Sequence, residues 1–120
     1  SVKILGGVAR GFPLATPKSE TRPTAVIIKR KLFDWRQNLE GYIFVDVCAG
    51  SGAMAFEALS RGADRILVND MDRSAFATLK KNKDDVCRAF RFEEKRIQVT
   101  HLDARRWIEK ELSFELQSTE

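Results

Sequence analysis

A glycine-rich turn directly after an apolar run constrains the fold of this chain more than any other stretch. Residues 42–48 form the apolar run, Gly50-Ser51-Gly52 follow it, and residues 54–61 are compatible with a helix that ends at Gly62. Strand, glycine turn and helix in this order present backbone N–H groups and a helix N-terminus to a nucleotide-like ligand. We therefore expect an α/β domain whose ligand site is built around this turn.

Strand-like and helix-like segments continue to alternate after the turn. Apolar runs at 65–70 and 96–100 predict a second and a third strand, while amphipathic patterns predict one helix capped by Asp72 and another over 105–112. Connections of this length favour parallel strands joined by right-handed crossovers. The sequence thus predicts an open sheet with the strand order 3-2-1.

The N-terminal part differs from this body in pattern and in charge. Runs at 2–5 and 8–14 flank Gly6-Gly7 and predict a β-hairpin, and residues 25–37 form an amphipathic segment that predicts a helix. Residues 1–36 carry eight basic and two acidic side chains, whereas the remainder of the chain has a net charge of −2. A basic segment on a near-neutral body is typical of polyanion binding, although a solvated basic face would look the same. We divide the chain into a basic extension, residues 1–24, and a Rossmann-like cofactor-binding domain, residues 25–120.

Composition excludes several other classes of protein. No apolar run approaches the roughly 20 residues that span a bilayer, and no signal-peptide pattern opens the sequence. Cys48 and Cys87 lie far apart and match no metal-binding spacing, and His101 is the sole histidine. We therefore expect free thiols, a cytoplasmic location, no membrane contact and no bound metal.

The sequence of the glycine turn is compatible with two kinds of ligand. Residues 50–55 fit the dinucleotide pattern GxGxxA, and Asp70 follows at the distance of the acid that binds a ribose in NAD enzymes. S-adenosylmethionine needs close backbone approach to its amino-acid part, a carboxylate for its ribose and a polar group near its adenine. Asp70 and Asp103 suit the last two roles, and Asp46 lies within the first strand. Each acid also has a plain alternative, because Asp46 could accept backbone N–H groups, Asp70 could be only a polar strand end, and Asp103 could cap the last helix.

Several stretches together resemble the bacterial 16S ribosomal RNA guanine-N2 methyltransferases of the RsmD family. The similarity covers nearly the whole chain and rests on Ile4–Gly11, Thr21–Thr24 with Lys29 and Leu32-Phe33, Asp46–Gly52, Glu57–Ala63, Asp70–Arg73, Lys80–Asn82 and Asp103-Ala104. The resemblance implies the N-terminal half of a class I S-adenosylmethionine-dependent methyltransferase fold, which is Rossmann-like. It also implies methyl transfer to the exocyclic N2 amine of a guanine, in 16S ribosomal RNA or in a 30S assembly intermediate.

By the same resemblance, functional residues can be carried over position by position. The residues implied to bind S-adenosylmethionine are Thr24, Asp46, Ala49, Gly50, Ser51, Gly52, Asp70, Met71, Asp103 and Ala104. The basic residues implied to contact RNA are Lys3, Arg10, Lys18, Arg22, Lys29 and Arg30. Val26-Ile27, Lys29-Arg30 and Asp34 depart from the family pattern near the cofactor entry.

The family's catalytic motif, Asn/Asp-Pro-Pro-Tyr/Phe after a fourth strand, is absent from these residues, since the prolines are Pro13, Pro17 and Pro23. The catalytic residues are therefore unknown, and we expect residues 1–120 alone to be inactive. Without a fourth strand, strand one is a sheet edge, so we expect a fragment, or a chain completed by another segment or by self-association. The alternatives are a non-catalytic RNA- or cofactor-binding remnant and, third, an NAD-dependent oxidoreductase.

Overall fold

The structure, a computed structural model, describes residues 2–17, 38–107 and 109–110. In chain order the elements are β1 (Val2–Lys3), β2 (Pro13–Leu14), β3 (Ile43–Asp46), α2 (Ala53–Ser60), β4 (Arg65–Asn69), α3 (Arg73–Phe90), the 3₁₀ helix η1 (Glu94–Arg96), β5 (Ile97–Thr100) and α4 (Ala104–Trp107). The helix predicted over 25–37 and the end of the helix predicted over 105–112 lie outside the described residues. The helices within the described ranges are not long and apolar enough to cross a membrane.

Three parallel strands form the sheet in the order β3-β4-β5, which confirms the predicted order 3-2-1. Phe44 of β3 pairs with Ile66 of β4, which in turn pairs with Ile97 of β5. The central strand β4 is an unbroken apolar run over its middle, as expected of a parallel strand that is buried on both faces. The outer strand β3 instead alternates exposed and buried residues, so only one of its faces packs into the core.

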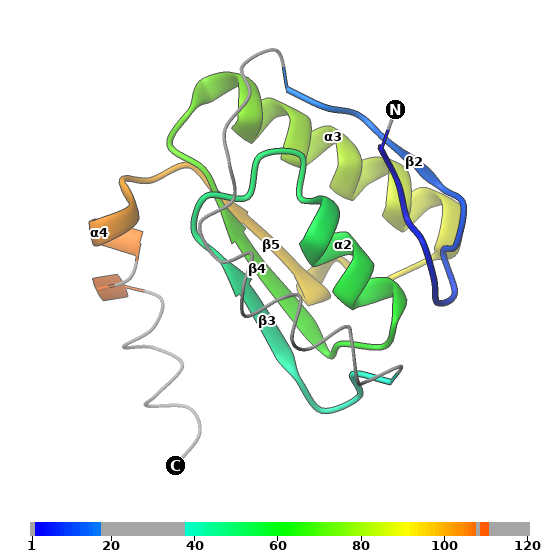
Figure 1. Cartoon of the computed structure of the whole chain (residues 1–120). Coiled ribbons are helices and arrows are strands. Elements are labelled where there is room, and N and C mark those ends of the chain that lie inside the picture. Colours follow the sequence, from blue (N-terminus) through cyan, green and yellow to red (C-terminus); the bar gives the residue numbers. More distant parts are fainter. Residues whose placement is uncertain (1, 18–37, 108, 111–120) are drawn as a thin grey trace.

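Helices α2 and α3 pack on the same face of this sheet (Figure 1). Helix α3 buries Ala75, Leu79, Asn82 and Val86, whose spacing places them on one stripe of the helix. Helix α2 is buried along most of its length, because the sheet lies on one side of it and the N-terminal hairpin on another. The end of α2 is as predicted: Gly62 has a φ of 103°, a left-handed conformation that glycine adopts without strain.

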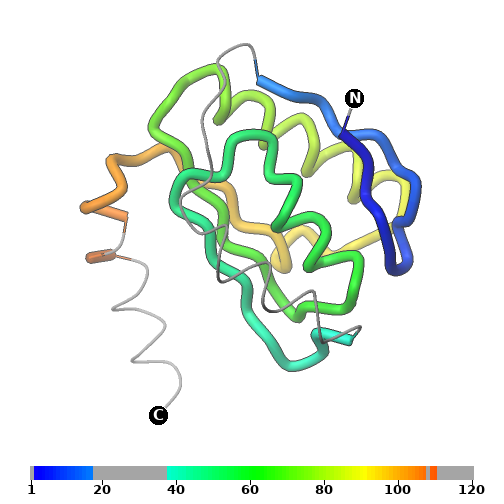
Figure 2. Tube along the Cα trace, viewed as in Figure 1, coloured from blue at the N-terminus to red at the C-terminus, as the bar shows by residue number. Residues whose placement is uncertain are grey.

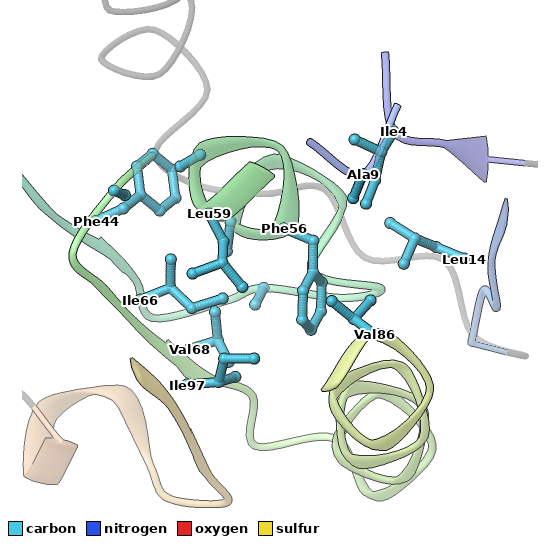
Figure 3. Packing of buried hydrophobic residues seen from close by; sticks show 14 of the residues in the cluster. Ile4, Ala9, Leu14, Phe44, Phe56, Leu59, Ile66, Val68, Val86 and Ile97 are labelled. Atoms are coloured by element: carbon cyan, nitrogen blue, oxygen red, sulfur yellow. The ribbon is translucent and has the colours of Figure 1, made fainter. Parts of the chain in front are cut away.

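The N-terminal hairpin joins the same core. Figure 3 shows Ile4 and Leu14 beside Phe56 of α2 and Val86 of α3 in one cluster. Phe12 also meets Phe90 of α3 edge to face, with ring centroids 5.3 Å apart. The hairpin is therefore packed against the helical layer (Figure 2).

The predicted hairpin is confirmed, but the prediction of its turn is wrong. Only two residues on each side pair, Val2 with Leu14 and Lys3 with Pro13, and residues 4–12 form a long loop between the strands. The loop closes on itself through the Ile4 N–H, which donates to the Phe12 carbonyl at 3.0 Å, and the Gly11 N–H, which donates to the Ile4 carbonyl at 2.7 Å. Gly6-Gly7 does not form a tight hairpin turn because this part of the loop is hydrogen-bonded to α2.

A candidate cofactor site at the carboxyl ends of the strands

The glycine turn connects β3 to α2 at the carboxyl edge of the sheet. Gly50 and Gly52 have φ values of 59° and 77°, in the left-handed region that favours glycine. The Gly52 N–H donates to the Ala49 carbonyl at 2.8 Å, and α2 starts at the next residue. A Cβ on Gly52 would lie 2.7 Å from side-chain atoms of both Leu79 and Phe56, so packing between helices already requires glycine there.

Asp70 ties this turn to the loop that follows β4. Its side chain is buried, and its Oδ2 accepts a hydrogen bond from the Gly50 N–H at 3.0 Å. Its Oδ1 accepts one from the Asp72 N–H at 2.9 Å. Because each carboxylate oxygen can accept more than one hydrogen bond, these two contacts orient Asp70 and leave it capacity to accept a further donor.

Asp46 is the last residue of β3 and lies four residues before Gly50. It is 1% exposed, and its Oδ1 accepts a hydrogen bond from the Cys48 N–H at 3.1 Å. The carboxylate therefore accepts a backbone N–H group, as the plain interpretation of this residue expected. The same contact fixes its charge beneath the start of the glycine turn.

The loops after β4 and β5 bring Met71 and Asp103 to the same edge of the sheet. Met71 is 64% exposed, and its carbonyl lies 3.0 Å from Nε2 of His101, which links the two loops. Asp103 is exposed, and its Oδ1 accepts a hydrogen bond from the Arg105 N–H at 3.0 Å. Asp103 thus caps the short helix α4, which begins at Ala104. Thr24, the remaining residue assigned to the cofactor, lies outside the described residues.

Sequence reasoning missed Asn69, which organises this edge. Its side chain is fully buried, and its Nδ2 donates to the carbonyls of Val47 and Leu102 at 3.1 and 3.0 Å. Its Oδ1 accepts from the Thr100 hydroxyl at 2.7 Å and from the Leu102 N–H at 3.0 Å. The side chain therefore joins the ends of all three strands. The sequence feature that could have indicated this role is an amide side chain at the end of an otherwise apolar strand.

Asn82 of α3 was also missed, although it holds the glycine turn from the other side. It is 1% exposed, and its Nδ2 donates to the Ser51 carbonyl at 2.8 Å and to the Ala15 carbonyl at 3.0 Å. Its Oδ1 accepts the Ala15 N–H at 2.9 Å. One side chain thus connects the turn to the base of the N-terminal hairpin. A polar residue on the buried stripe of α3 was the signal for this role.

The basic residues assigned to RNA are only partly within the described structure. Lys3 and Arg10 are both exposed on the hairpin, whereas Lys18, Arg22, Lys29 and Arg30 lie outside the described residues. The tip of the hairpin contacts the C-terminal end of α2, while the glycine turn precedes its N-terminal end (Figures 1 and 2). An eight-residue helix is roughly 12 Å long, so Arg10 and the glycine turn lie at opposite ends of α2.

The described side chains at this edge of the sheet offer hydrogen-bond acceptors and an apolar surface to a ligand. In the described ranges, no group of three or more His, Cys, Asp or Glu side chains is arranged to hold a metal ion. Asp46 is a buried acid close to the turn, and its charge opposes a doubly charged pyrophosphate and suits a ligand with an ammonium group. Exposed Met71 offers an apolar surface beside Asp70 for a flat ring. Asp103 and Ala104 lie at the end of the neighbouring strand.

The sheet order, the glycine turn and the acids at the strand ends define a partial Rossmann-like domain of the class I methyltransferase type. The chain belongs to the family described as Conserved hypothetical protein 95, whose model matches residues 2–115. This match, together with the named relatives, confirms the resemblance to the RsmD family seen in the sequence.

Two curated relatives of the chain carry the same name. Ribosomal RNA small subunit methyltransferase D of Haemophilus influenzae is 41% identical over 86 residues, which cover 68% of this chain and 43% of that protein. The protein of the same name from Escherichia coli strain K12 is 39% identical over 83 residues, covering 68% of this chain and 42% of its own length. The chain therefore matches less than half the length of these relatives.

Solved structures share the fold. The Escherichia coli protein yhhF superposes with a TM-score of 0.69 and 30% sequence identity, over 89% of this chain and 55% of that one. A hypothetical protein of Thermus thermophilus gives a TM-score of 0.68 at 30% identity, over 96% of this chain and 63% of that one. The first of these structures is titled a putative methyltransferase, and the two matches cover between half and two thirds of the solved chains.

Proposed function

We propose that this chain is the cofactor-binding portion of a cytoplasmic S-adenosylmethionine-dependent methyltransferase. Its substrate would be the exocyclic N2 amine of a guanine in 16S ribosomal RNA, either free or within a 30S assembly intermediate. The observation that carries this proposal is the family match over residues 2–115, with relatives named ribosomal RNA small subunit methyltransferase D. The acids that surround the glycine turn supply the independent chemical support.

The cofactor would lie across the carboxyl edge of the sheet. The backbone at Ala49, Gly50, Ser51 and Gly52 would face its amino-acid part, because Gly50 and Gly52 have no side chain that could separate the ligand from the backbone. Asp70 would accept hydrogen bonds from the ribose hydroxyls in addition to the N–H groups that orient it.

Met71, Asp103 and Ala104 would border the adenine. The exposed thioether of Met71 provides a polarisable apolar surface for the ring face. Asp103 is an exposed acceptor at the end of β5, held in place by the first turn of α4. Thr24 and Asp46 would complete the pocket.

When bound, S-adenosylmethionine supplies a methyl group on a positively charged sulfonium, which is already reactive toward an amine. The contribution of this chain is therefore binding, orientation and electrostatics. The carboxylate of Asp46 lies beneath the turn and would favour a cationic ligand. The hydrogen bonds that fix Asp46 and Asp70 keep these charges in place before any ligand binds.

RNA would be held by the basic N-terminal segment. Lys3 and Arg10 are exposed on a hairpin that is packed against the core, so their charges are presented from a fixed backbone. Lys18, Arg22, Lys29 and Arg30 would extend this surface. Contacts to phosphates supply affinity without sequence specificity, so the choice of guanine rests on other parts of the protein.

Methyl transfer with a defined product tests the proposal. The intact protein is incubated with methyl-tritiated S-adenosylmethionine and either 16S ribosomal RNA or 30S particles, and the RNA is digested to nucleosides. We expect the label in N2-methylguanosine, and a loss of roughly tenfold or more in kcat/KM for Asp70→Asn, as befits a hydrogen bond to a charged group. Glu93→Gln, which alters an exposed acid on the loop before η1, is the matched control and should retain full activity. Label at another base atom, or in ribosomal protein alone, would refute the proposed substrate.

A further inference from the structure

The loop of the N-terminal hairpin is held to α2 by a buried carboxylate. Oε1 of Glu57 accepts the Leu5 N–H at 2.8 Å, and Oε2 accepts the Gly6 N–H at 2.9 Å. Glu57 is 7% exposed. The same Oε2 lies 2.8 Å from Nε of Arg61, one helical turn further along. The carboxylate thus exchanges its hydration for three N–H donors, which is the condition under which a buried charge is tolerated.

Ser60 holds the other side of the same loop. Its Oγ accepts the Ala9 N–H at 2.8 Å and donates to the Gly6 carbonyl at 2.6 Å. The Ser60 carbonyl accepts the Val8 N–H at 2.9 Å, because it lies near the end of α2, where carbonyls have no partner within the helix. Glu57 and Ser60 are almost one helical turn apart, so both face the hairpin.

The anchored backbone directs the side chains of this loop outward. Leu5 is 74% exposed and Val8 is 71% exposed, the highest values among the large apolar residues of the described structure. Arg10 is exposed directly after them. The loop therefore presents apolar groups beside a cation on a fixed backbone, and the cation suits the phosphates of RNA.

We propose that Glu57 and Ser60 are positioning residues for RNA, which fix residues 5–9 on α2 so that Leu5, Val8 and Arg10 meet the RNA as a preformed surface. This inference rests on the proposed function and adds residues that do not themselves touch the RNA. A loop already ordered in the free protein loses less conformational entropy on binding, so its affinity is higher than that of the same side chains on a loose loop. Because both residues lie at the end of α2 away from the glycine turn, their effect should be confined to RNA.

The test separates RNA binding from cofactor binding in the intact protein. Glu57→Gln replaces one acceptor oxygen by an NH₂ group that opposes an N–H donor, and Ser60→Ala removes the hydroxyl without changing the helix. We expect each variant to bind in-vitro-transcribed 16S ribosomal RNA roughly threefold to tenfold more weakly, in filter binding at fixed salt. Amide hydrogen exchange at Leu5, Gly6 and Ala9 should accelerate about tenfold, and the affinity for S-adenosylhomocysteine should stay unchanged.

Two controls separate positioning from a general loss of stability or charge. Ile97→Ala removes buried core volume from β5, on the side of the core away from the hairpin, and should lower Tm while leaving the ratio of the two affinities as in the wild type. Glu93→Gln removes an exposed acid and should change neither affinity.

Glycine substitutions within the loop give a second, matched pair. A Cβ on Gly7 would lie 2.0 Å from the Ser60 carbonyl oxygen, whereas one on Gly11 would meet nothing within 4 Å. Both have positive φ values, 81° and 86°, so both alanine variants carry backbone strain. Only Gly7→Ala should displace the loop from α2 and weaken RNA binding.

The possible results of these experiments distinguish the positioning role from the proposed function. Faster loop exchange with unchanged RNA affinity in Glu57→Gln and Ser60→Ala would overturn the positioning role and leave the proposed function intact. Equal losses of RNA and S-adenosylhomocysteine affinity would show that Glu57 and Ser60 stabilise the fold as a whole and do not specifically position the RNA-binding loop. Wild-type protein that binds no ribosomal RNA would overturn both this inference and the proposed substrate.

Discussion

At the scale of single residues, buried polar side chains set the geometry of the candidate site. Asn69 joins the ends of the three strands, and Asp70 joins the glycine turn to the loop after β4. Asn82 fixes the turn from the side of α3. Each of these groups is satisfied by several backbone partners, so each restrains a loop that has no regular hydrogen bonding of its own. The described part of the site is therefore held in place by the protein's own hydrogen bonds.

The two cysteines make a residue-scale prediction about pH. Both Cys48 and Cys87 are free thiols, as expected from the sequence. Burial raises the pKa of the Cys87 thiol, because desolvation disfavours the thiolate more than nearby Lys83 favours it. Only the thiolate is nucleophilic. In a Cys48→Ser variant, alkylation by iodoacetamide should therefore show a pH midpoint above that of an ordinary thiol. A midpoint at or below the ordinary value would show that Cys87 is not desolvated.

At the scale of elements, the cap of α3 is the clearest local signal that the structure confirms. Oδ2 of Asp72 accepts the Ala75 N–H at 2.9 Å at the start of α3. Replacing an N-cap aspartate with alanine typically costs about 1 kcal/mol. We expect Asp72→Ala to lower the free energy of unfolding by that amount in urea denaturation. Asp84→Ala, an exposed position within the same helix, is the control and should change it little. Equal effects of the two variants would argue against a capping role.

The elements differ in how well the sequence predicts them, for physical reasons. Strands β4 and β5 and the start of α3 follow from apolar runs and a cap, which are local signals. The loop of the hairpin does not, because its shape depends on Glu57 and Ser60, more than fifty residues away in sequence. A glycine pair predicts a tight turn only when no distant partner competes for its backbone N–H groups.

At the scale of the whole molecule, the outer edge of β3 has no neighbouring strand in the part of the chain that the structure describes. Among the residues that the structure describes, β3 pairs with β4 and with no second strand. Ile43 and Val45 on its outer face are 42% and 38% exposed. An apolar strand edge of this kind pairs readily with another chain.

We therefore expect residues 1–120 to self-associate as concentration rises. Sedimentation equilibrium measures this directly. Val45→Lys should weaken the association because a charge opposes strand pairing, whereas Val8→Lys, on the hairpin loop, should not. A monomer at every concentration, or equal behaviour of the two variants, would contradict the role of this edge.

The candidate site as a whole could be predicted from sequence only in outline. The glycine turn and Asp70 are marked by their spacing along the chain, because both directly follow strands of one parallel sheet. Asn69 and Asn82 could not be assigned, since their partners come from different loops and become neighbours only in the folded molecule. Nor could the sequence alone predict that the hairpin loop lies at the end of α2 away from the glycine turn.

Isothermal titration of the intact protein with S-adenosylhomocysteine tests the central claim, that the glycine turn and its acids form an S-adenosylmethionine pocket. We predict saturable binding of S-adenosylhomocysteine, no binding of NAD, and a loss of roughly tenfold or more in affinity for Asp70→Asn with Glu93→Gln unchanged. Binding of NAD without S-adenosylhomocysteine would contradict the account.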